Sequence, residues 1–525
     1  MYTVRTKLSK MLPSSVGRTS ACRVASMAQQ ILHRQVSTMV SSEHTEDVKP
    51  FDQIPGPKGV PFFGSLFDYT GLGPYKLDKL HEATVDRFRN FGPIFKETLA
   101  GVTHVHIIDP TDVRELFRNE GRSPKRTPID AMVKYRQTRS RHIGMANTEG
   151  DEWQKLRKPV QHLLMKPHSV NAYIPIMEEC ADDFVTLMRE TQDMESKEVP
   201  DFNHKMQRWT LESTCAIVFD TRMGCLNTGL DNNPEALEMI VSVSNFFDSL
   251  KDLTFSFPFW KFGITTKAWT KFTEAQDYFF GMSKKYATLA LERMKTAVGT
   301  GPQNSEGTFL ECLLARRDFD IDSLCDLMND LMIAAVETTA STLAFNLYCL
   351  AKNPDVQEKV FQEINEAIPP GTKVTAESLQ NLPYLKACIK ETVRVFPTVD
   401  GTNRIPSREI ALAGYKIPPD TIVRIHCIAG LMEEYFPSPE KYKPERWLRG
   451  DAECENIDPY LILPFGHGSR MCTGRRMAEQ DLYIMLIKIV QNFKIEWHHE
   501  EDMELIFRLT NVPDRPAQFR FISRT

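Results

Sequence analysis

The chain has 525 residues, of which 42% are hydrophobic and 25% charged, so it can bury a large core and lacks the composition of a disordered protein. It carries 64 basic and 69 acidic residues, an acidic balance that speaks against nucleic-acid binding. The 11 cysteines are scattered without a CxxC pair, which favours a reducing compartment over a disulfide framework. The chain contains no run of 18 apolar residues, so no membrane-spanning helix is predicted.

Residues 1–45 are predicted to be a mitochondrial targeting peptide. No acidic residue precedes Glu43, and Val24, Met27 and Ile31 recur at helical spacing. A secretory signal would need an apolar core, which this segment lacks. A disordered basic tail is the alternative. Because six basic residues of this segment precede Glu43, residues 43–525 have a net charge of −11. The six residues are Arg5, Lys7, Lys10, Arg18, Arg23 and Arg34.

Residues 46–60 are interpreted as a Pro-rich hinge, because the X-Pro steps of "IPGPKGVPFFG" (54–64) favour extended backbone. The folded domain is then expected at residues 61–525. Helical patterns fill its middle, and short β-type runs such as "THVHIID" (103–109) and "TIVRIHCI" (421–428) lie nearer its ends. This order predicts one large, mainly α domain of the α+β class with small sheets.

The run "DSLCDLMNDLMIAAVETTASTLAFNLYCLAKNP", which begins at Asp322, predicts a long helix. It is too apolar for a surface helix, so it should cross the core. Glu337 and Thr338 interrupt it, and a hydroxyl in mid-helix can bond the carbonyl one turn back and loosen the helix locally. The small side chains of Ala334 and Ala335 would leave the resulting space open. A solvated helix face is the alternative.

The stretch "PFGHGSRMCTGRRMAEQ" (464–480) places Cys472 directly before an amphipathic helical pattern. Positive charge and the free N–H groups of a helix N-terminus stabilise a thiolate, which is the ligand form of cysteine. A single thiolate without a second Cys or His at ligand spacing favours haem over zinc or an iron–sulfur cluster. A structural cysteine remains possible on this chemistry alone. Three glycines allow tight turns and close approach of a flat cofactor: Gly466, Gly468 and Gly474.

The order of four motifs then identifies a family. "FGHGSRMCTG" fits F-x-x-G-x-R-x-C-x-G, "KETVR" fits E-x-x-R, "YKPERW" resembles the PERF motif, and "AAVETT" resembles an oxygen-activation motif. Over about residues 50–525 the chain resembles the cytochrome P450 haem-thiolate monooxygenases. The resemblance implies the helical P450 fold, haem b (iron protoporphyrin IX) as cofactor, and an oxidoreductase that acts on paired donors with incorporation of O2.

The resemblance assigns haem-binding roles residue by residue. Cys472 is the axial ligand of the haem iron, and Phe465 and Gly466 belong to its loop. Trp153 and Arg157 match the family's W-x-x-x-R, which binds a haem propionate. Two further arginines are expected at the propionates, because buried carboxylates need such donors; they are Arg404 and Arg470.

The resemblance also implies structural and catalytic roles. Glu391, Arg394 and Arg446 are expected to form a buried structural cluster, although an exposed helical ion pair is the alternative for the first two. Thr338 would hydrogen-bond the oxygen being activated, and Glu337 would relay protons to it. The family usually has Gly at position 335 and often Asp at position 337, so the oxygen pocket should be slightly tighter here.

The basic residues Lys386 and Lys390, at i and i+4, with Arg475 and Arg476 resemble the mitochondrial branch of the family. The resemblance implies an adrenodoxin-like [2Fe–2S] ferredoxin as electron donor, steered by charge. Ordinary solvated lysines are the alternative. The aromatic stretch "FSFPFWKFGITTKAW" (255–269) resembles the loop over the substrate entrance, and with Lys261 and Lys267 it suits a peripheral contact with the matrix side of the inner membrane. A small core cluster is the alternative reading of this loop.

Substrate is expected to be small and lipophilic. "KPFDQIPGP", "DPYLILPFGHG" and "AEQDLYIML" resemble arthropod mitochondrial ecdysteroid hydroxylases of the side-chain 22-hydroxylase type, whereas "AAVETTA" and "PYLKACIKE" resemble the vitamin D 24-hydroxylase type. A sterol or steroid hydroxylase is therefore favoured. The alternatives are oxidation of xenobiotics or of a vitamin D-like secosteroid, a haem isomerase or dehydratase that needs no electrons, and a non-catalytic haem carrier or sensor.

Overall fold

The computed structural model describes residues 48–524 except 71–72, 230–232, 298–306, 317–319, 452 and 454–456. The predicted targeting peptide at 1–45 therefore lies outside the described residues. The chain divides into two units, one containing residues up to Gln53 with Gly414–Lys416, the other containing Ile54–Ala413 and Ile417–Thr525. In the first unit, Lys49 and Tyr415 form a parallel β-bridge. The second unit contains every site residue predicted above.

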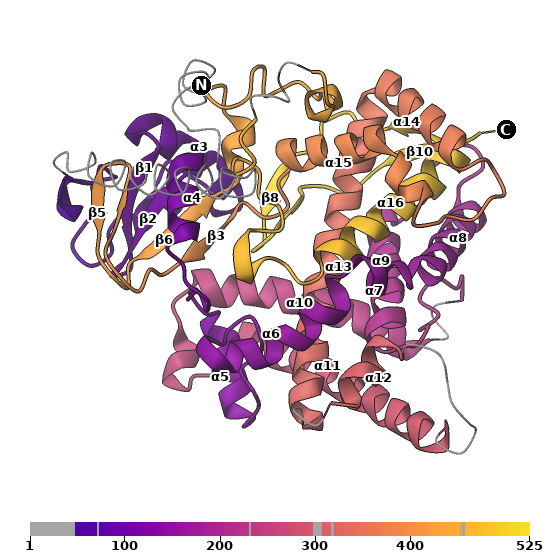
Figure 1. The fold of residues 1–525 in the computed structure, drawn as a ribbon, viewed down its shortest axis with the longest axis horizontal. Helices are drawn as coiled ribbons and strands as arrows, with labels where there is room; N and C mark the ends of the chain where they lie inside the picture. The colour runs from indigo at the N-terminus through magenta and orange to yellow at the C-terminus, as the bar shows by residue number, and fades with distance from the viewer. Residues whose placement is uncertain are drawn as a thin grey trace, which may run out of the picture. The chain divides into compact units, whose positions relative to one another are not determined.

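Helices make up most of the second unit, as predicted from the sequence (Figure 1). The α-helices are α3 Leu80–Phe91, α4 Pro110–Arg118, α5 Asp130–Thr138, α6 Gly150–Leu164, α7 Pro167–Asn171, α8 Ile174–Thr191, α9 Phe202–Val218, α10 Pro234–Phe255, α11 Lys267–Ala297, α12 Phe309–Leu314, α13 Ile321–Lys352, α14 Pro354–Ala367, α15 Pro383–Val395 and α16 Arg475–Asn492. Short 3-10 helices include η2 Leu66–Tyr69, η3 Leu77–Lys79, η5 Phe259–Phe262, η7 Ile428–Leu431, η8 Pro444–Trp447 and η9 Gly468–Arg470. None of the helices in the described part of the chain is long and apolar enough to cross a membrane.

The strands are short and gather into small sheets. They are β1 Ile94–Leu99, β2 Val102–Ile107, β3 Gly401–Arg404, β4 Ile410–Leu412, β5 Tyr415–Ile417, β6 Ile422–His426, β7 Phe493–Trp497, β8 Leu505–Phe507, β9 Asn511–Pro513 and β10 Phe519–Ser523. One sheet has the order β1-β2-β6-β3, and its β2–β6 pair is parallel, with Val105 opposite Val423. β7 pairs with β10 and β8 pairs with β9, both antiparallel. The predicted mainly α class with small sheets is confirmed.

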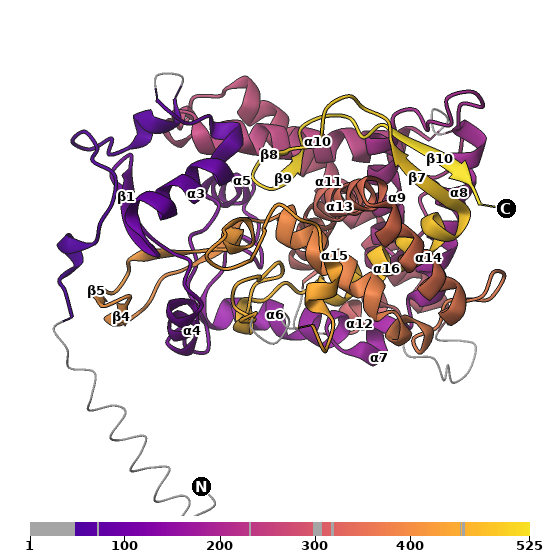
Figure 2. The ribbon, with the colours of Figure 1, turned by 90° about the horizontal axis from the view of Figure 1, so that it is seen from above.

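Helix α13 crosses the core, as its apolar sequence predicts. The side chain of Asp320 accepts a hydrogen bond from the N–H of Ser323 at 2.7 Å and so caps its start. Pro354 follows its last residues and begins α14. α13 packs against α9, α11, α15 and α16, which surround it in Figure 2. It is one uninterrupted α-helix, so the loosening expected near Thr338 does not break it.

Candidate active site

The loop before α16 holds Cys472 in a tight backbone conformation. The N–H of Cys472 donates to the carbonyl of Phe465 at 2.9 Å and closes the loop. Gly466 and Gly468 have φ values of +68° and +73°, a region that suits glycine. At Gly468 a Cβ would also lie 2.2 Å from a carboxylate oxygen of Glu120, so a larger residue would require that side chain to move. The glycines that sequence analysis singled out thus shape the cysteine loop.

The thiol of Cys472 lies close to many protein atoms, although the residue is exposed. Desolvation by the surrounding atoms raises the pKa of the thiol above its ordinary value. Hydrogen bonds from the backbone of Gly474 and Arg475 and the charge of Arg157 act in the opposite direction. A metal ion deprotonates a coordinating thiol outright, so a bound cation would complete this set of stabilising groups.

Four arginines gather close to this loop. The charges of Arg404 and Arg157 lower the pKa of Arg126, and the charges of Arg126 and Arg404 lower that of Arg470. Burial is the largest cause for both, and the two pKa values fall to about 10 for Arg126 and about 9 for Arg470. The only ion pair of the group that the described residues show joins Arg404 to Glu120 at 2.5 Å.

The arginine cluster is defined by Arg126, Arg157, Arg404 and Arg470, and among the described residues Glu120 balances only part of its charge. Arg470 donates to the carbonyls of Pro124 and Thr148 at 2.9 and 2.7 Å. Its buried Nη1 has no hydrogen-bond partner in the described structure. Buried like charges with an unused donor are costly unless an anion binds them. The cluster therefore suits a ligand that carries carboxylates.

Arg126 was not predicted from the sequence. It lies in "SPKRTP", where nothing in the pattern separates it from a surface arginine. Trp153, which was predicted, is buried, and the guanidinium of Arg470 stacks over its ring with a carbon-to-centroid distance of 4.1 Å. Arg157 on α6 is buried as well. The structure thus brings Trp153 and the three predicted arginines together and adds Arg126.

One stripe of α13 is accessible, although the helix crosses the core. Ala334 is exposed and Ala335 and Thr338 are partly exposed, whereas Val336 and Ala340 are buried. These accessible positions follow the 3.6-residue period of a single helix face. The small side chains of the two alanines therefore lie on the accessible face of the helix.

Thr338 belongs to this stripe, whereas its neighbour Glu337 is buried. The hydroxyl of Thr338 donates to the carbonyl of Ala334, one turn back, at 2.8 Å. The side chain of Glu337 is buried, and burial raises its pKa to about 7. Its carboxylate accepts a hydrogen bond from the hydroxyl of Thr510 at 3.2 Å. Glu337 can therefore hold or release a proton near neutral pH, as a general acid or base requires.

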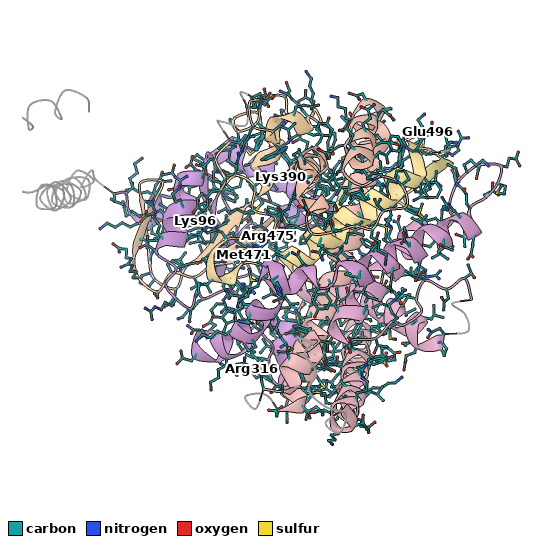
Figure 3. The ribbon with its side chains drawn as sticks, turned by 45° about the vertical axis from the view of Figure 1, so that its right-hand side comes forward. Lys96, Arg316, Lys390, Met471, Arg475 and Glu496 are labelled. Atoms are coloured by element: carbon teal, nitrogen blue, oxygen red, sulfur yellow. The ribbon has the colours of Figure 1, made fainter. Side chains whose placement is uncertain are left out.

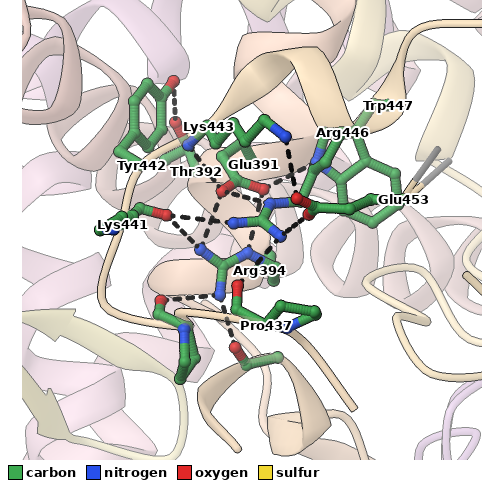
Figure 4. Close-up of polar contacts among 12 residues, drawn as sticks. Glu391, Thr392, Arg394, Pro437, Lys441, Tyr442, Lys443, Arg446, Trp447 and Glu453 are labelled. Carbon is green, nitrogen blue, oxygen red and sulfur yellow. Dashed lines mark hydrogen bonds and ion pairs between the residues drawn. The ribbon is translucent and has the colours of Figure 1, made fainter. Parts of the chain in front are cut away.

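Glu391, Arg394 and Arg446 form a fully buried cluster between α15 and η8 (Figure 4). Arg394 donates to both carboxylate oxygens of Glu391, at 2.9 and 2.8 Å, and Arg446 donates to one of them at 3.0 Å. The N–H of Lys443 and the indole of Trp447 donate as well, at 2.9 and 2.8 Å. These residues lie together in the geometry that resemblance implied, rather than as an exposed ion pair.

Of the predicted basic residues, Lys390 and Arg475 lie near Met471 of the cysteine loop (Figure 3). Lys390 and Arg475 are exposed. Burial lowers the pKa of Lys386, and the charge of the nearby Lys390 lowers it further. Arg475 pairs with Glu479 at 3.0 Å, and Arg476 is exposed beside it. We call Lys386, Lys390, Arg475 and Arg476 the basic face.

The aromatic segment at 255–269 is divided between surface and core. Phe257 and Phe262 are 62% and 70% exposed. Trp260 is buried and stacks on Trp269 with a centroid distance of 5.5 Å. Lys261 pairs with Asp130 on α5. The phenylalanines thus project outward from a segment that the tryptophans anchor.

The residues of the site fit haem b. Cys472 is an exposed cysteine, and the arginine cluster offers buried positive charge with an unused donor, Nη1 of Arg470, which suits the carboxylates of haem b. No group of three or more His, Cys, Asp or Glu side chains among residues the structure describes could hold a bare metal ion. A porphyrin supplies the other ligands of its metal, so a single thiolate such as that of Cys472 suits it.

Comparisons with known proteins agree with this site. The cytochrome P450 family model matches residues 54–521. Cytochrome P450 10 of Lymnaea stagnalis is 34% identical over 93% of this chain and 89% of its own length. The mitochondrial 1,25-dihydroxyvitamin D(3) 24-hydroxylase of Mus musculus is 31% identical over 90% of this chain and 89% of its own. Probable cytochrome P450 12a5, mitochondrial, of Drosophila melanogaster is 32% identical over 95% of this chain and 96% of its own length. The chain therefore belongs to the cytochrome P450 family of haem b monooxygenases.

Proposed function

We propose that this enzyme is a mitochondrial hydroxylase of a sterol or steroid that receives electrons from a [2Fe–2S] ferredoxin. Two relatives with a mitochondrial designation match over nine tenths of the chain, and one of them is a 24-hydroxylase of a secosteroid. The leader at 1–45 has the pattern of a targeting peptide. The observation that carries the electron-donor proposal is the basic face beside the cysteine loop, because it is complementary to a small acidic protein.

The proposed roles follow from the positions of the side chains. Cys472 would bind the haem iron, and the arginine cluster with Trp153 would hold the propionates. Phe465 and Gly466 would shape the loop against the cofactor. When bound, haem b supplies the activation of dioxygen. Glu337 would hold a proton close to the accessible stripe, and the hydroxyl of Thr338 would pass it on after releasing the carbonyl of Ala334.

Contact with a membrane is part of the proposal. Phe257 and Phe262 project outward, and Lys267 lies beside them, which suits a shallow contact with the inner membrane. Such a contact would allow a lipophilic substrate to enter from the bilayer. The matrix side follows from the position of the proposed ferredoxin partner.

The test is reconstitution of the purified enzyme with NADPH, a ferredoxin and its reductase. A panel of ecdysteroid precursors, other sterols, a vitamin D-like secosteroid and a xenobiotic would be added, and products identified by mass spectrometry. A product one oxygen heavier from a sterol or ecdysteroid supports the proposal. Turnover of the xenobiotic alone would overturn the substrate class, and absence of substrate-dependent NADPH consumption would support a haem carrier or sensor. The reduced carbon monoxide complex of Cys472→Ser should lose the red-shifted Soret band of thiolate ligation.

A further inference from the structure

The hydrogen-bonding environment of Glu337 differs from that of most buried carboxylates. Its side chain is buried, and among the described residues no charged group lies close enough to shift its pKa. Arg508, two positions before Thr510, is not available to it, because its guanidinium pairs with Asp248 on α10. The one hydrogen bond that the described structure gives Glu337 comes from the hydroxyl of Thr510. A buried carboxylate depends strongly on each donor it has.

Thr510 lies in the turn between β8 and β9, and this turn is held in place. The N–H of Arg508 donates to the carbonyl of Thr510 at 2.7 Å. The neighbouring Asn511 donates from its backbone to Thr398 and from its side chain to Pro397, both at 2.7 Å. Asn511 is buried, so the turn has little freedom to withdraw.

The 397–398 segment that binds Asn511 also contacts α13, one turn after Thr338. The hydroxyls of Thr398 and Thr342 lie 2.9 Å apart. Thr342 also donates to the carbonyl of Thr338 at 2.7 Å. The β8–β9 turn, the 397–398 segment and α13 are therefore joined by hydrogen bonds that begin at Glu337 and end at Thr338. These contacts hold the β8–β9 turn, and with it the hydroxyl of Thr510, against α13.

We propose that Thr510 is a positioning residue for proton delivery, which holds the Glu337 carboxylate in place from the β8–β9 turn. The inference rests on the proposed role of Glu337 as proton source. The longer side chain of Glu, where the family often has Asp, extends one methylene further from the α13 backbone, and in this chain it meets Thr510. The hydrogen bond from the Thr510 hydroxyl also stabilises the ionised form of Glu337, so removing that hydroxyl should favour the protonated form of Glu337.

The matched variants are Thr510→Val, which removes the hydroxyl at nearly equal volume, and Thr510→Ser, which keeps it. Infrared difference spectra of the ferric haem-loaded protein would follow the carbonyl band of protonated Glu337 with pH, and Glu337→Gln identifies that band. We expect Thr510→Val to raise the titration midpoint by about half a pH unit or more and Thr510→Ser to leave it near the parent value. An unchanged midpoint in Thr510→Val, or an equal shift in Thr510→Ser, overturns the proposal.

A second measurement follows coupling, the ratio of product to NADPH consumed. Thr510→Val should lower this ratio and release more hydrogen peroxide in the parent background, and should have no further effect in Glu337→Gln. An equal effect in both backgrounds would show a general disturbance of the turn and overturn the positioning role. If Thr510→Val does not load haem, Thr510→Ala carries the same comparison. The infrared titration needs neither substrate nor ferredoxin, so it decides this inference even if sterol hydroxylation is wrong.

Discussion

Arg126, Arg157, Arg404 and Arg470 concentrate positive charge where the chain itself provides little negative charge. The charges of its neighbours help to lower the pKa of Arg126 to about 10, and burial is the larger cause. This arrangement stores unfavourable energy that an anionic ligand can relieve. Replacing Arg126 should therefore weaken cofactor binding while it relieves repulsion in the haem-free chain.

For Arg126→Gln we expect haem to dissociate roughly tenfold faster, because one charge-assisted donor is lost. The rate is measured as transfer of haem to excess apomyoglobin. Arg122, which is exposed on the same segment, offers the control Arg122→Gln, with no change expected. Equal dissociation rates for parent and Arg126→Gln would remove Arg126 from the cofactor site.

Asp481 on α16 is a second buried acid and gives a prediction on pH. Burial raises its pKa to about 7, against a hydrogen bond from Ser213 at 2.9 Å. Between its ordinary pKa of 3.8 and about 7, the unfolded chain loses this proton and the folded chain keeps it. The contribution of Asp481 to stability therefore falls as pH rises through this window and is constant above it.

Asp481→Asn should remove that loss. The variant should gain stability relative to the parent as pH rises from 4 to 7, by up to about 4 kcal/mol. Urea unfolding midpoints at pH 5 and pH 8, followed by circular dichroism, measure the gain. Parallel pH profiles for parent and variant would contradict it. Ser213→Ala, which removes the opposing hydrogen bond, should enlarge the pH dependence.

At the scale of the elements, the Glu391 cluster fixes α15 against η8. Five donor groups converge on this carboxylate, and Arg394 also donates to the carbonyls of Gly430 and Lys441. Removing one partner of a buried ion pair leaves its counterpart uncompensated. Glu391→Gln should therefore cost about 3–5 kcal/mol of stability, seen as little or no haem-loaded protein on expression. Glu445→Gln, which removes the partly exposed pairing with Lys359, should cost under about 1 kcal/mol.

The elements that carry motifs could be predicted from the sequence, because their signals are local. The long apolar helix from Asp322 became α13 and the helix after Cys472 became α16. The β-type run at 103–109 overlaps β2, and the run at 421–428 contains β6. Each depends on periodicity or on a short spacing.

Long-range pairings could not be predicted in this way. The Nδ1 of His106 on β2 and the Nε2 of His426 on β6 lie 2.9 Å apart, although 320 residues separate them in the chain. The parallel pairing of β2 with β6 brings them together. Arg126 joins the arginine cluster, and Thr510 reaches Glu337, only because distant segments fold against each other. Periodicity and short spacings in a single sequence do not show which distant segments pack together.

At the scale of the whole molecule, charge is unevenly distributed. Residues 43–525 have a net charge of −11, yet the basic face exposes Lys390, Arg475 and Arg476 beside the cysteine loop. An acidic ferredoxin would be repelled by the molecule as a whole and attracted at this one face. Binding should therefore weaken steeply as salt rises, because exposed charges are screened within about 10 Å at 0.1 M.

For Lys390→Glu we expect the KM for ferredoxin to rise about tenfold at low salt, while the turnover at saturating ferredoxin stays close to the parent value. Charge reversal acts on encounter and orientation rather than on the chemistry inside the site. The matched control is Lys494→Glu on β7, which should leave the KM for ferredoxin unchanged. In the parent enzyme, Lys494 pairs with Glu496. Because Lys390→Glu and Lys494→Glu change net charge equally, a similar rise in both would show that net charge alone sets the affinity. That outcome would show that the basic face is not the docking site of the electron donor.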